Sequence, residues 1–229
     1  MSWEDILREI ERDRARGATA LAERALDAFA LSKASAGRLL KIRPSMPLIA
    51  AVVRKAKKAG VGAARRELKK ATEKIVAQAV DILPPGGRYR VFGISGTVEA
   101  VLKAVGAKLT DEERADVALV GADALMPNGD FVAGKGTSEF VRSARAGQCG
   151  TFVVATELKR VKADVPLEKG FERVNGKLVH AALTEKGLVF PPLAAIPGVD
   201  QSWLDRGALN PHGGIGRCHP HHARQGDKP

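Results

Sequence analysis

Two polar residues stand where apolar segments end, and both could do chemistry. Asp123 follows the apolar run 117–122, and Ser95 lies in the glycine-containing segment 93–97. A carboxylate at a strand end can serve as a general acid or base. A strand–glycine–helix turn over 93–97 would offer backbone N–H groups, including that of Gly96, to a phosphate. Asp and Ser are also common turn formers, and periodicity alone favours that structural role for both residues.

A second glycine-rich segment follows Asp123 directly. Asn128-Gly129 predicts a hairpin turn, and a helix begins near Thr137, where freed N–H groups and the helix dipole favour an anion beside Lys135. The segment Gly129–Lys135 has the G-x-x-x-x-G-K spacing of a nucleotide-binding loop. However, Gly136 stands where Ser or Thr would bind Mg²⁺, and the first glycine belongs to the hairpin. This near-match does not favour ATP or GTP hydrolysis.

The segment from Leu209 onward contains a thiol and several imidazoles. Cys218-His-Pro-His-His222 and the nearby His212 have the ligand types of a zinc site. The same segment is rich in Gly, Pro, His and Arg and has little apolar surface to bury, so its composition favours a disordered tail. We therefore predict neither a metal nor a cofactor.

The composition is that of an ordinary globular protein. Of the 229 residues, 45% are hydrophobic and 28% are charged. No uncharged apolar stretch reaches the roughly eighteen residues that a membrane span needs, and the first residues lack the layout of a signal peptide. Two cysteines are too few for a disulfide scaffold. We expect a soluble, cytoplasmic protein that does not contact a membrane.

The positive charge is concentrated in one segment. Residues 33–74 contain thirteen Lys or Arg against two acids, an excess equal to the net charge of the whole chain, +11. Basic patches attract phosphate or acidic partners. No aromatic residue lies in this segment, whereas single-strand binding relies on aromatic stacking. The pattern therefore favours a solvated basic helix face and argues against nucleic acid as a partner.

The chain divides into a helical front and an alternating back. Ser2 and Asp5 form a capping box before the first apolar helical pattern, and Pro84-Pro-Gly-Gly87 ends the last one. Beyond it, short apolar strands alternate with helices, which indicates an α/β fold with a mainly parallel sheet and flanking helices. The predicted helices are 21–29, 49–56, 61–83, 98–105 and 138–146, and the predicted strands are 89–94, 116–121, 151–156 and 178–183.

Four segments in the same order resemble one protein family. They are the run 119–137, Arg16-Gly-Ala18, Arg43-Pro-Ser45 and Thr184-Glu-Lys-Gly-Leu-Val-Phe-Pro-Pro192. This set resembles the alpha, beta and delta regulatory subunits of eukaryotic translation initiation factor two-B and the related ribose-1,5-bisphosphate and methylthioribose-1-phosphate isomerases. The resemblance covers roughly residues 4 to 195. It implies an N-terminal helical domain (1–84), a Rossmann-like α/β domain (85–207) and a homodimer or higher homo-oligomer. The composition, not the resemblance, predicts the disordered tail at 208–229.

The resemblance also assigns roles to residues. The family's catalytic carboxylate falls on Asp123, and its catalytic cysteine falls on Ser95. Its phosphate and sugar contacts fall on the following positions: Arg16, Gly17, Ala18, Thr19, Arg43 and Lys159. The family's Asn-Lys is here Ala133-Gly134, with Lys135 displaced by one place. An alkoxide, unlike a thiolate, is not accessible near neutral pH, which weakens Ser95 as a base.

These departures leave two hypotheses of different classes. Between Thr97 and Val117 the chain lacks a strand–helix unit and an arginine-containing loop of typical family members, so it resembles a shortened member. The favoured hypothesis is a regulatory-subunit-like protein that binds a phosphorylated small molecule and a partner, which the resemblance suggests is an initiation factor. The alternative is a sugar-phosphate isomerase in which Ser95 replaces the catalytic cysteine.

Overall fold

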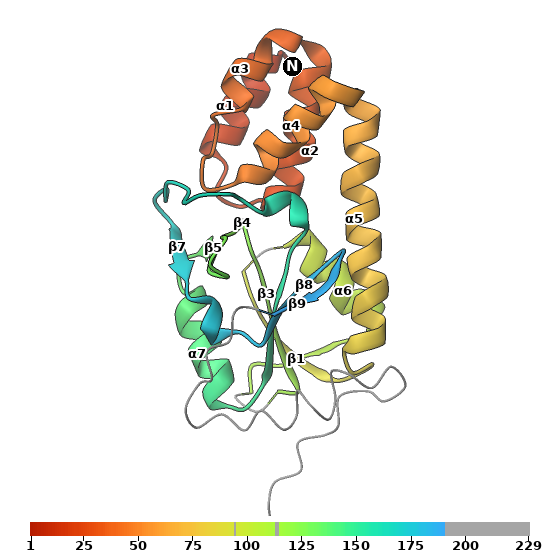
Figure 1. The fold of residues 1–229 in the computed structure, drawn as a ribbon, viewed down its shortest axis with the longest axis vertical. Helices are drawn as coiled ribbons and strands as arrows, with labels where there is room; N and C mark the ends of the chain where they lie inside the picture. Colours follow the sequence, from red (N-terminus) through yellow and green to blue (C-terminus); the bar gives the residue numbers. More distant parts are fainter. Residues whose placement is uncertain (94, 113–114, 191–229) are drawn as a thin grey trace, which may run out of the picture.

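The computed structural model describes residues 1–93, 95–112 and 115–190, arranged as a group of helices above an α/β sheet region (Figure 1). The helical group consists of α1 (Trp3–Arg12), α2 (Ala18–Leu31), η1 (Lys33–Ser35), α3 (Ala36–Leu39), α4 (Pro47–Ala59) and α5 (Val61–Ile82). The Ser2–Asp5 capping box is confirmed at the start of α1. Apolar faces of α1, α2, α4 and the first half of α5 meet in one buried core.

Helix α5 is long enough to serve two cores. Ala64 and Leu68 pack in the core of the helical group, whereas Ile75 and Ala79 pack against the sheet region. These residues form the buried stripe expected from the sequence. Figure 1 shows α5 running from the upper helices down beside the sheet. The helix therefore connects the two regions through packed apolar contacts.

The main sheet has six strands in the order β2-β1-β3-β6-β8-β9. The strands are β1 (Arg88–Phe92), β2 (Lys108–Leu109), β3 (Val117–Gly121), β6 (Gly150–Val154), β8 (Ala181–Thr184) and β9 (Gly187–Val189). All pairs are parallel except β8 with β9. Helix α6 (Gly96–Ala104) and α5 cover one face, and α7 (Thr137–Ala146) covers the other. The predicted α/β fold with a mainly parallel sheet is confirmed.

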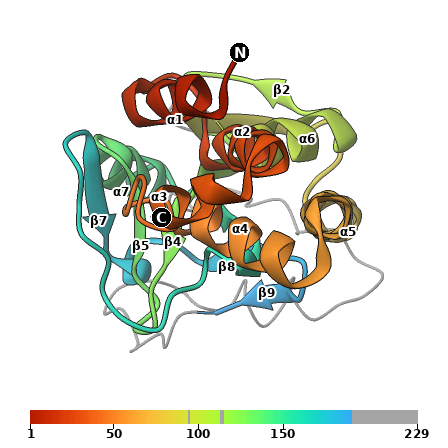
Figure 2. The same cartoon turned by 90° about the horizontal axis from the view of Figure 1, so that it is seen from above.

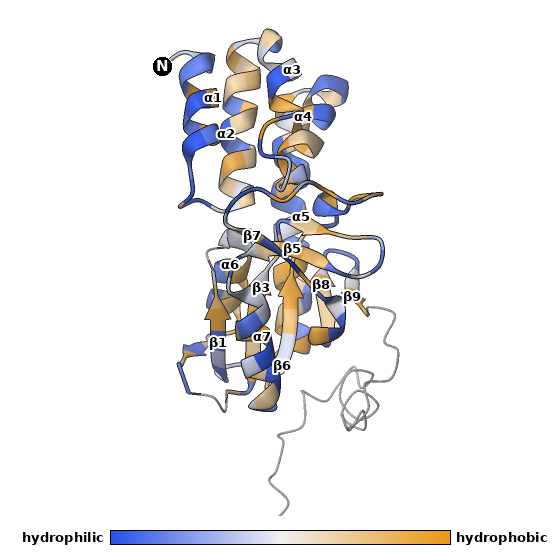
Figure 3. Ribbon diagram, turned by 90° about the vertical axis from the view of Figure 1, so that its left-hand side faces the viewer, coloured by the Kyte–Doolittle hydropathy of each residue, from blue (hydrophilic) through white to orange (hydrophobic). Residues whose placement is uncertain are grey.

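Strand β3 shows why both faces of the sheet are buried. Val117 and Leu119 pack on the side of α5 and α6, whereas Ala118 and Val120 pack on the side of α7. A strand covered on both faces reads as a continuous apolar run, as this one does in the sequence. Seen from above, α5 and α7 lie on opposite sides of the molecule (Figure 2). Hydrophobic residues gather in the strands between them (Figure 3).

A small antiparallel sheet follows the end of β3. It consists of β4 (Ala124–Leu125), β5 (Phe131–Gly134) and β7 (Phe171–Val174) in the order β4-β5-β7. The predicted hairpin at Gly129 is confirmed, and this glycine adopts φ 87° in the turn. Because β5 occupies the middle of the G-x-x-x-x-G-K segment, that segment is a strand and not a phosphate loop.

Several elements differ from the sequence-based expectation. The strand predicted at 178–183 is β8, which starts at Ala181, because the 3-10 turn η3 (Gly176–Leu178), capped by the Asn175 side chain, comes first. Strands β2, β7 and β9 were not predicted. Residues 105–112 and 115–116, between α6 and β3, contain only the two-residue strand β2 and no helix. Among the described residues, no helix is long and apolar enough to cross a membrane.

Candidate functional site

The predicted site lies where the helical group meets the carboxyl ends of the parallel strands. Because β1, β3 and β6 are adjacent and parallel, their ends bring Ser95, Asp123 and Lys159 to one edge of the sheet. The turn η2 (Glu157–Lys159) contacts α4, and Leu158 and Phe171 pack against the helical core. Figure 1 shows the segment after β6 rising to the helices. Ligands of α/β proteins bind at such strand ends.

Arg43 joins three segments at this boundary. Its side chain is 3% exposed, and its Nη1 donates to the carbonyl oxygens of Asp13 (2.6 Å) and Ile10 (3.3 Å) at the end of α1. Its Nε lies 3.0 Å from Oε1 of Glu168, and its guanidinium lies over the Phe171 ring, 5.7 Å from the centroid. Arg43 therefore connects α1 to the segment before β7.

The ion pair of Arg43 with Glu168 is close but imperfectly aligned. The 3.0 Å separation defines an ion pair, yet the buried Nε has no partner in hydrogen-bond geometry. Arg43 also adopts φ 48°, a left-handed conformation that costs a non-glycine residue energy. The carboxylate of Glu168 is itself fixed, because its Oε2 accepts a hydrogen bond from the backbone N of Ser45 (3.2 Å). A strained, buried cation faces a carboxylate that belongs to the same chain.

Two further hydrogen bonds fasten this contact. The hydroxyl of Ser45 donates to the carbonyl of Pro166 (2.8 Å) and accepts from the backbone N of Glu168 (2.8 Å). Ser45 is fully buried. The predicted segment Arg43-Pro-Ser45 thus binds the 166–168 segment through both of its polar side chains. Glu168 belongs to this charged cluster, and the sequence analysis did not single it out.

Asp123 and Lys159 form the second half of the charged cluster. The Lys159 side chain is 3% exposed, and its Nζ donates to the carbonyl of Ala122 (2.6 Å). Burial lowers the pKa of Lys159, and the negative charge of Asp123 opposes that effect. Burial likewise raises the pKa of Asp123 above its usual value. The positive charges of Lys159 and Arg43 oppose this rise, and the negative charge of Glu168 adds to it. A carboxyl group with a raised pKa can donate a proton as well as accept one.

The start of α2 carries the predicted segment Arg16–Thr19. Gly17 is the N-cap of α2 and Ala18 its first residue, and no side chain caps this end, so backbone N–H groups are available there. Arg16 is paired with Glu9 and with Asp13 (2.7 Å), and those carboxylates raise its pKa. Asp13 also accepts from Arg43 through its backbone carbonyl, so the two predicted phosphate-binding arginines meet at one residue.

Ser95 performs a structural task in the structure. It is the N-cap of α6, and its hydroxyl accepts a hydrogen bond from the backbone N of Val98 (3.4 Å). Ser95 lies close to Gly121: a Cβ atom added to Gly121 would be only 2.9 Å from the Cβ of Ser95. Within the described residues, no carboxylate or imidazole hydrogen-bonds to this hydroxyl. Gly96 is exposed at the first position of α6.

The predicted anion position before α7 is already filled by a carboxylate. Glu172 accepts a hydrogen bond from the backbone N of Ser138 (2.8 Å) in the first turn of α7. Lys135 is exposed, and its backbone N donates to the carbonyl of Gly170 (2.9 Å). The structure therefore does not bring the Lys135 side chain into the cluster of Arg43, Asp123 and Lys159. No sequence pattern singled out Glu172, which lies 34 residues from Ser138.

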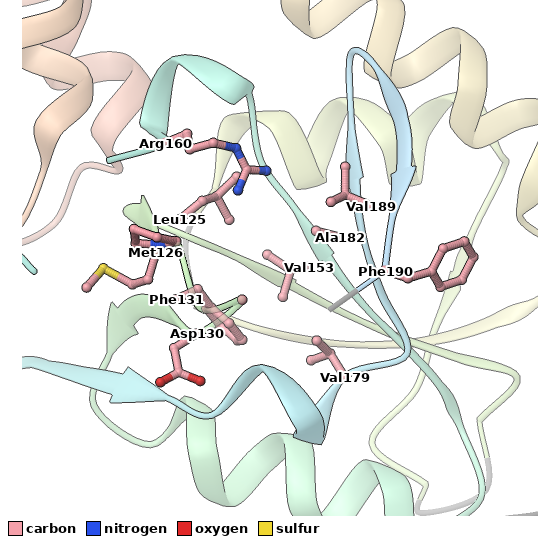
Figure 4. A pocket seen from close by; sticks show the side chains of 12 residues that line it. Leu125, Met126, Asp130, Phe131, Val153, Arg160, Val179, Ala182, Val189 and Phe190 are labelled. Atoms are coloured by element: carbon pink, nitrogen blue, oxygen red, sulfur yellow. The ribbon is translucent and has the colours of Figure 1, made fainter. Parts of the chain in front are cut away.

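A cavity of about 110 Å³ lies elsewhere, beside β5, β6 and β8 (Figure 4). Its walls are mainly apolar, with Arg160 at one end and Asp130 at the other. Glu157 pairs with Arg160 through two hydrogen bonds of 2.6 Å. None of the predicted site residues lines this cavity. It is separate from the charged cluster.

The described residues contain no group of three or more His, Cys, Asp or Glu side chains arranged to hold a metal ion. The Cys218–His222 segment and His212 lie outside the described residues.

Comparisons with known proteins identify the fold. No protein-family model and no curated protein matches the sequence. A translation initiation factor eIF-2B from Pyrococcus horikoshii OT3 is similar, with a TM-score of 0.70 and 20% identity over 83% of this chain and 97% of that one. The tetrameric eIF2B beta2–delta2 complex of C. thermophilum follows, with a TM-score of 0.62 and 17% identity over 82% and 90%.

An enzyme has the same fold. The 5-methylthioribose 1-phosphate isomerase of Pyrococcus horikoshii OT3 gives a TM-score of 0.59 and 16% identity over 83% of this chain and 85% of that one. The chain has the fold of translation initiation factor two-B subunits. The resemblance found in the sequence is confirmed at the level of the fold, and this fold is shared by initiation factor two-B subunits and an isomerase. The initiation factor two-B fold alone does not decide between them.

Proposed function

We propose that this chain is a regulatory-subunit-like protein of the initiation factor two-B type, which binds a phosphorylated small molecule at the Arg43–Asp123–Lys159 cluster and also binds a protein partner. The observation that carries the proposal is the buried charge at the boundary of two regions. Arg43 and Lys159 are both almost fully buried there. Buried cations where the helical group meets the strand ends suit a small anionic ligand, and the start of α2 in the same helical group is uncapped.

The geometry around Ser95 favours a binding role over isomerisation. Moving a proton between neighbouring carbons needs a base that is deprotonated near neutral pH. The Ser95 hydroxyl caps α6 instead, and among the described residues no basic side chain hydrogen-bonds to it to activate it. The isomerase alternative depends on Asp123, whose raised pKa suits a general acid or base. Asp123 would then act without a second catalytic group at position 95.

Carboxylates of the protein itself compete with a phosphate ligand for the two arginines. Glu168 pairs with Arg43, and Glu9 and Asp13 pair with Arg16. A phosphate that binds Arg43 must displace Glu168 or share the cation with it. Replacing Glu168 with Gln removes this competing charge and keeps the side chain's size. We expect Glu168→Gln to tighten phosphate-ester binding about tenfold, since close charge pairs are worth one to a few kcal/mol.

The partner and the assembly state are part of the proposal. One protein with this fold occurs as a tetrameric beta2–delta2 complex. By analogy with it, we propose a homodimer or higher homo-oligomer and an initiation-factor partner for this chain. Light scattering of the purified protein tests the assembly state. A monomer at all concentrations would remove that part of the proposal.

Phosphorus NMR with ribose-1,5-bisphosphate, followed over time, tests the function. We expect broadened signals with no new species, and stronger broadening with Glu168→Gln. Ketose-bisphosphate signals that disappear in Asp123→Asn would instead establish the isomerase alternative. Ser95→Cys is the informative second variant, because turnover that appears only with the thiol would locate the loss of activity at position 95. Unchanged, sharp signals for both the protein and Glu168→Gln would remove this ligand from the proposal.

A further inference from the structure

Six exposed cations on α4 and α5 have no ion-pair partner among the described residues. They form what we call the basic face: Arg54, Lys57, Lys58, Arg66, Lys70 and Lys74. The other cations of these two helices are paired. Lys55 pairs with Glu67, Lys69 lies 3.8 Å from Glu73, and Arg65 pairs with Glu23 and Asp27 of α2. The basic face is therefore what remains after the internal pairing of α4 and α5.

The α5 part of the basic face is a single stripe. Arg66, Lys70 and Lys74 are spaced four residues apart, which places them about 6 Å apart along the helix axis. They alternate with the buried stripe that includes Leu68 and Ile75, so they lie on the side of α5 away from the core. Helix α4 packs alongside α5 (Figure 2), and Arg54, Lys57 and Lys58 are its exposed cations without an ion-pair partner among the described residues.

Ordinary helix electrostatics explains only part of this arrangement. Lys57 and Lys58 lie in the last turn of α4, where the helix dipole favours cations. Arg66, Lys70 and Lys74 lie within α5 and gain nothing comparable. Like charges four residues apart destabilise a helix. The stripe is thus unfavourable for the isolated protein and becomes favourable beside a regular array of anions.

We propose that the basic face binds the phosphate backbone of a double-helical nucleic acid. The absence of aromatic residues from 33–74 argues against a single strand, which would need stacking platforms, but backbone contacts to a duplex need only cations. The sequence-based argument against nucleic acid therefore applies to single strands. A duplex presents phosphates at regular intervals, which suits a rigid row of Lys and Arg.

The chemistry of the surface argues against two other anionic partners. Protein interfaces are depleted in Lys and depend on apolar anchors. Four of the six cations are Lys, and the exposed large apolar side chains nearest in sequence are Leu31 and Val80, outside 33–79. An interfacial membrane helix would likewise need an exposed apolar face, which α5 lacks along this stripe.

Fluorescence anisotropy with labelled duplexes of about 20 base pairs, longer than the roughly 33 Å of α5, tests the proposal. RNA and DNA duplexes of equal length are compared between about 50 and 200 mM salt. The full chain is compared with Arg66→Gln/Lys70→Gln/Lys74→Gln. The matched control is Lys108→Gln/Lys162→Gln/Lys177→Gln, which removes the same charge from exposed positions of the sheet region.

The proposal expects the stripe variant to lose at least about tenfold in duplex affinity and to lower the salt slope by about 3, since each phosphate contact contributes about 0.9. The control should lose less than about threefold. Equal losses in both variants would mean a response to net charge alone and would overturn the proposal. Tighter binding of an acidic peptide or of anionic vesicles than of both duplexes would overturn it as well. If only the RNA duplex or only the DNA duplex binds, that result supports the proposal and shows which kind of duplex the basic face recognises.

Discussion

Two groups of cations in the same helical region have opposite surroundings. On α1, α2 and the site boundary, each arginine with a named role has a carboxylate: Arg16 has Glu9 and Asp13, and Arg43 has Glu168. On the basic face of α4 and α5, six cations have none among the described residues. Both groups lie in or beside helices whose apolar faces share one packed core. The difference is therefore one of charge arrangement and not of local fold.

Burial does not account for the difference. Arg43 needs a partner, because an unpaired buried charge costs several kcal/mol. Arg8 and Arg38 are more than half exposed and yet pair with Asp5 and Glu11. Exposed Arg8 and Arg38 thus have carboxylates within ion-pair distance, whereas the six cations of the basic face have none among the described residues. Paired cations hold the protein together, and unpaired ones remain available to an external anion.

The largest change in the free energy of unfolding is expected at Arg43, the buried member of the paired group. Arg43→Met keeps the side chain's bulk but removes the charge that balances Glu168 and the hydrogen bonds to Ile10 and Asp13. We expect a loss of about 3 kcal/mol in the free energy of unfolding, because breaking one side of a buried pair leaves the other uncompensated. Urea unfolding at pH 7 measures it.

Two companion variants sharpen this prediction. Arg43→Met/Glu168→Leu should recover part of the loss, because it removes both charges, and the double-mutant cycle gives their coupling. Arg54→Met, on the basic face, should change the unfolding free energy by less than about 0.5 kcal/mol. Equal losses of unfolding free energy in Arg43→Met and Arg54→Met would contradict the proposed difference between the two groups of cations.

A smaller effect is expected at Glu9, which pairs with two arginines. Hydrogen bonds from Arg24 and Arg16 lower the pKa of Glu9 from 4.5 to about 2. A carboxyl group whose pKa is depressed in the fold stabilises the protein above its unfolded-state pKa, and this contribution is lost as the pH falls from about 4.5 to about 2. Glu9→Gln should therefore cost about 1 kcal/mol at pH 7, after allowance for solvent screening of a surface network.

The difference between Glu9→Gln and the parent protein should shrink steadily below pH 4.5, as followed by urea unfolding at a series of pH values. Glu73→Gln is the control, because its carboxylate is largely exposed and lies 3.8 Å from Lys69. A constant difference across pH 3 to 7 would show that Glu9 acts by packing and not by charge.

The sequence predicts local features of this molecule well and distant ones poorly. The Ser2–Asp5 cap, the Gly129 hairpin and the strand that ends before Asp123 depend on neighbouring residues, and all three are confirmed. The family resemblance singled out Arg43 and Lys159 as ligand contacts, and the structure places both where the helical group meets the sheet region. Glu168 escaped prediction because its hydrogen-bond partner Ser45 lies 123 residues away and no periodic pattern connects them. Long-range charge pairing is therefore the part of the site that only the structure supplies.

The smallest change in stability is expected for the unpaired cations of α5, and it should be a gain and not a loss. Arg66→Gln/Lys70→Gln/Lys74→Gln removes two like-charge pairs at i,i+4 spacing, each of which costs roughly 0.2–0.5 kcal/mol. The variant should be more stable than the parent by about 0.5 kcal/mol at low salt, and the gain should fade near 1 M salt as screening increases. Thermal unfolding at several salt concentrations measures this.

The same control variant separates a local from a global effect. Lys108→Gln/Lys162→Gln/Lys177→Gln removes equal charge from positions that are not spaced along a helix. If that variant were stabilised equally, the gain would come from the lower net charge of a +11 chain and not from the stripe. A stabilised stripe variant that also loses duplex affinity would mean that the cations of α5 weaken the free protein and serve a bound anion. Removing the paired cation Arg43 should lower the free energy of unfolding, whereas removing the unpaired cations of the α5 stripe should raise it. Changes of opposite sign are therefore expected for the two groups of cations.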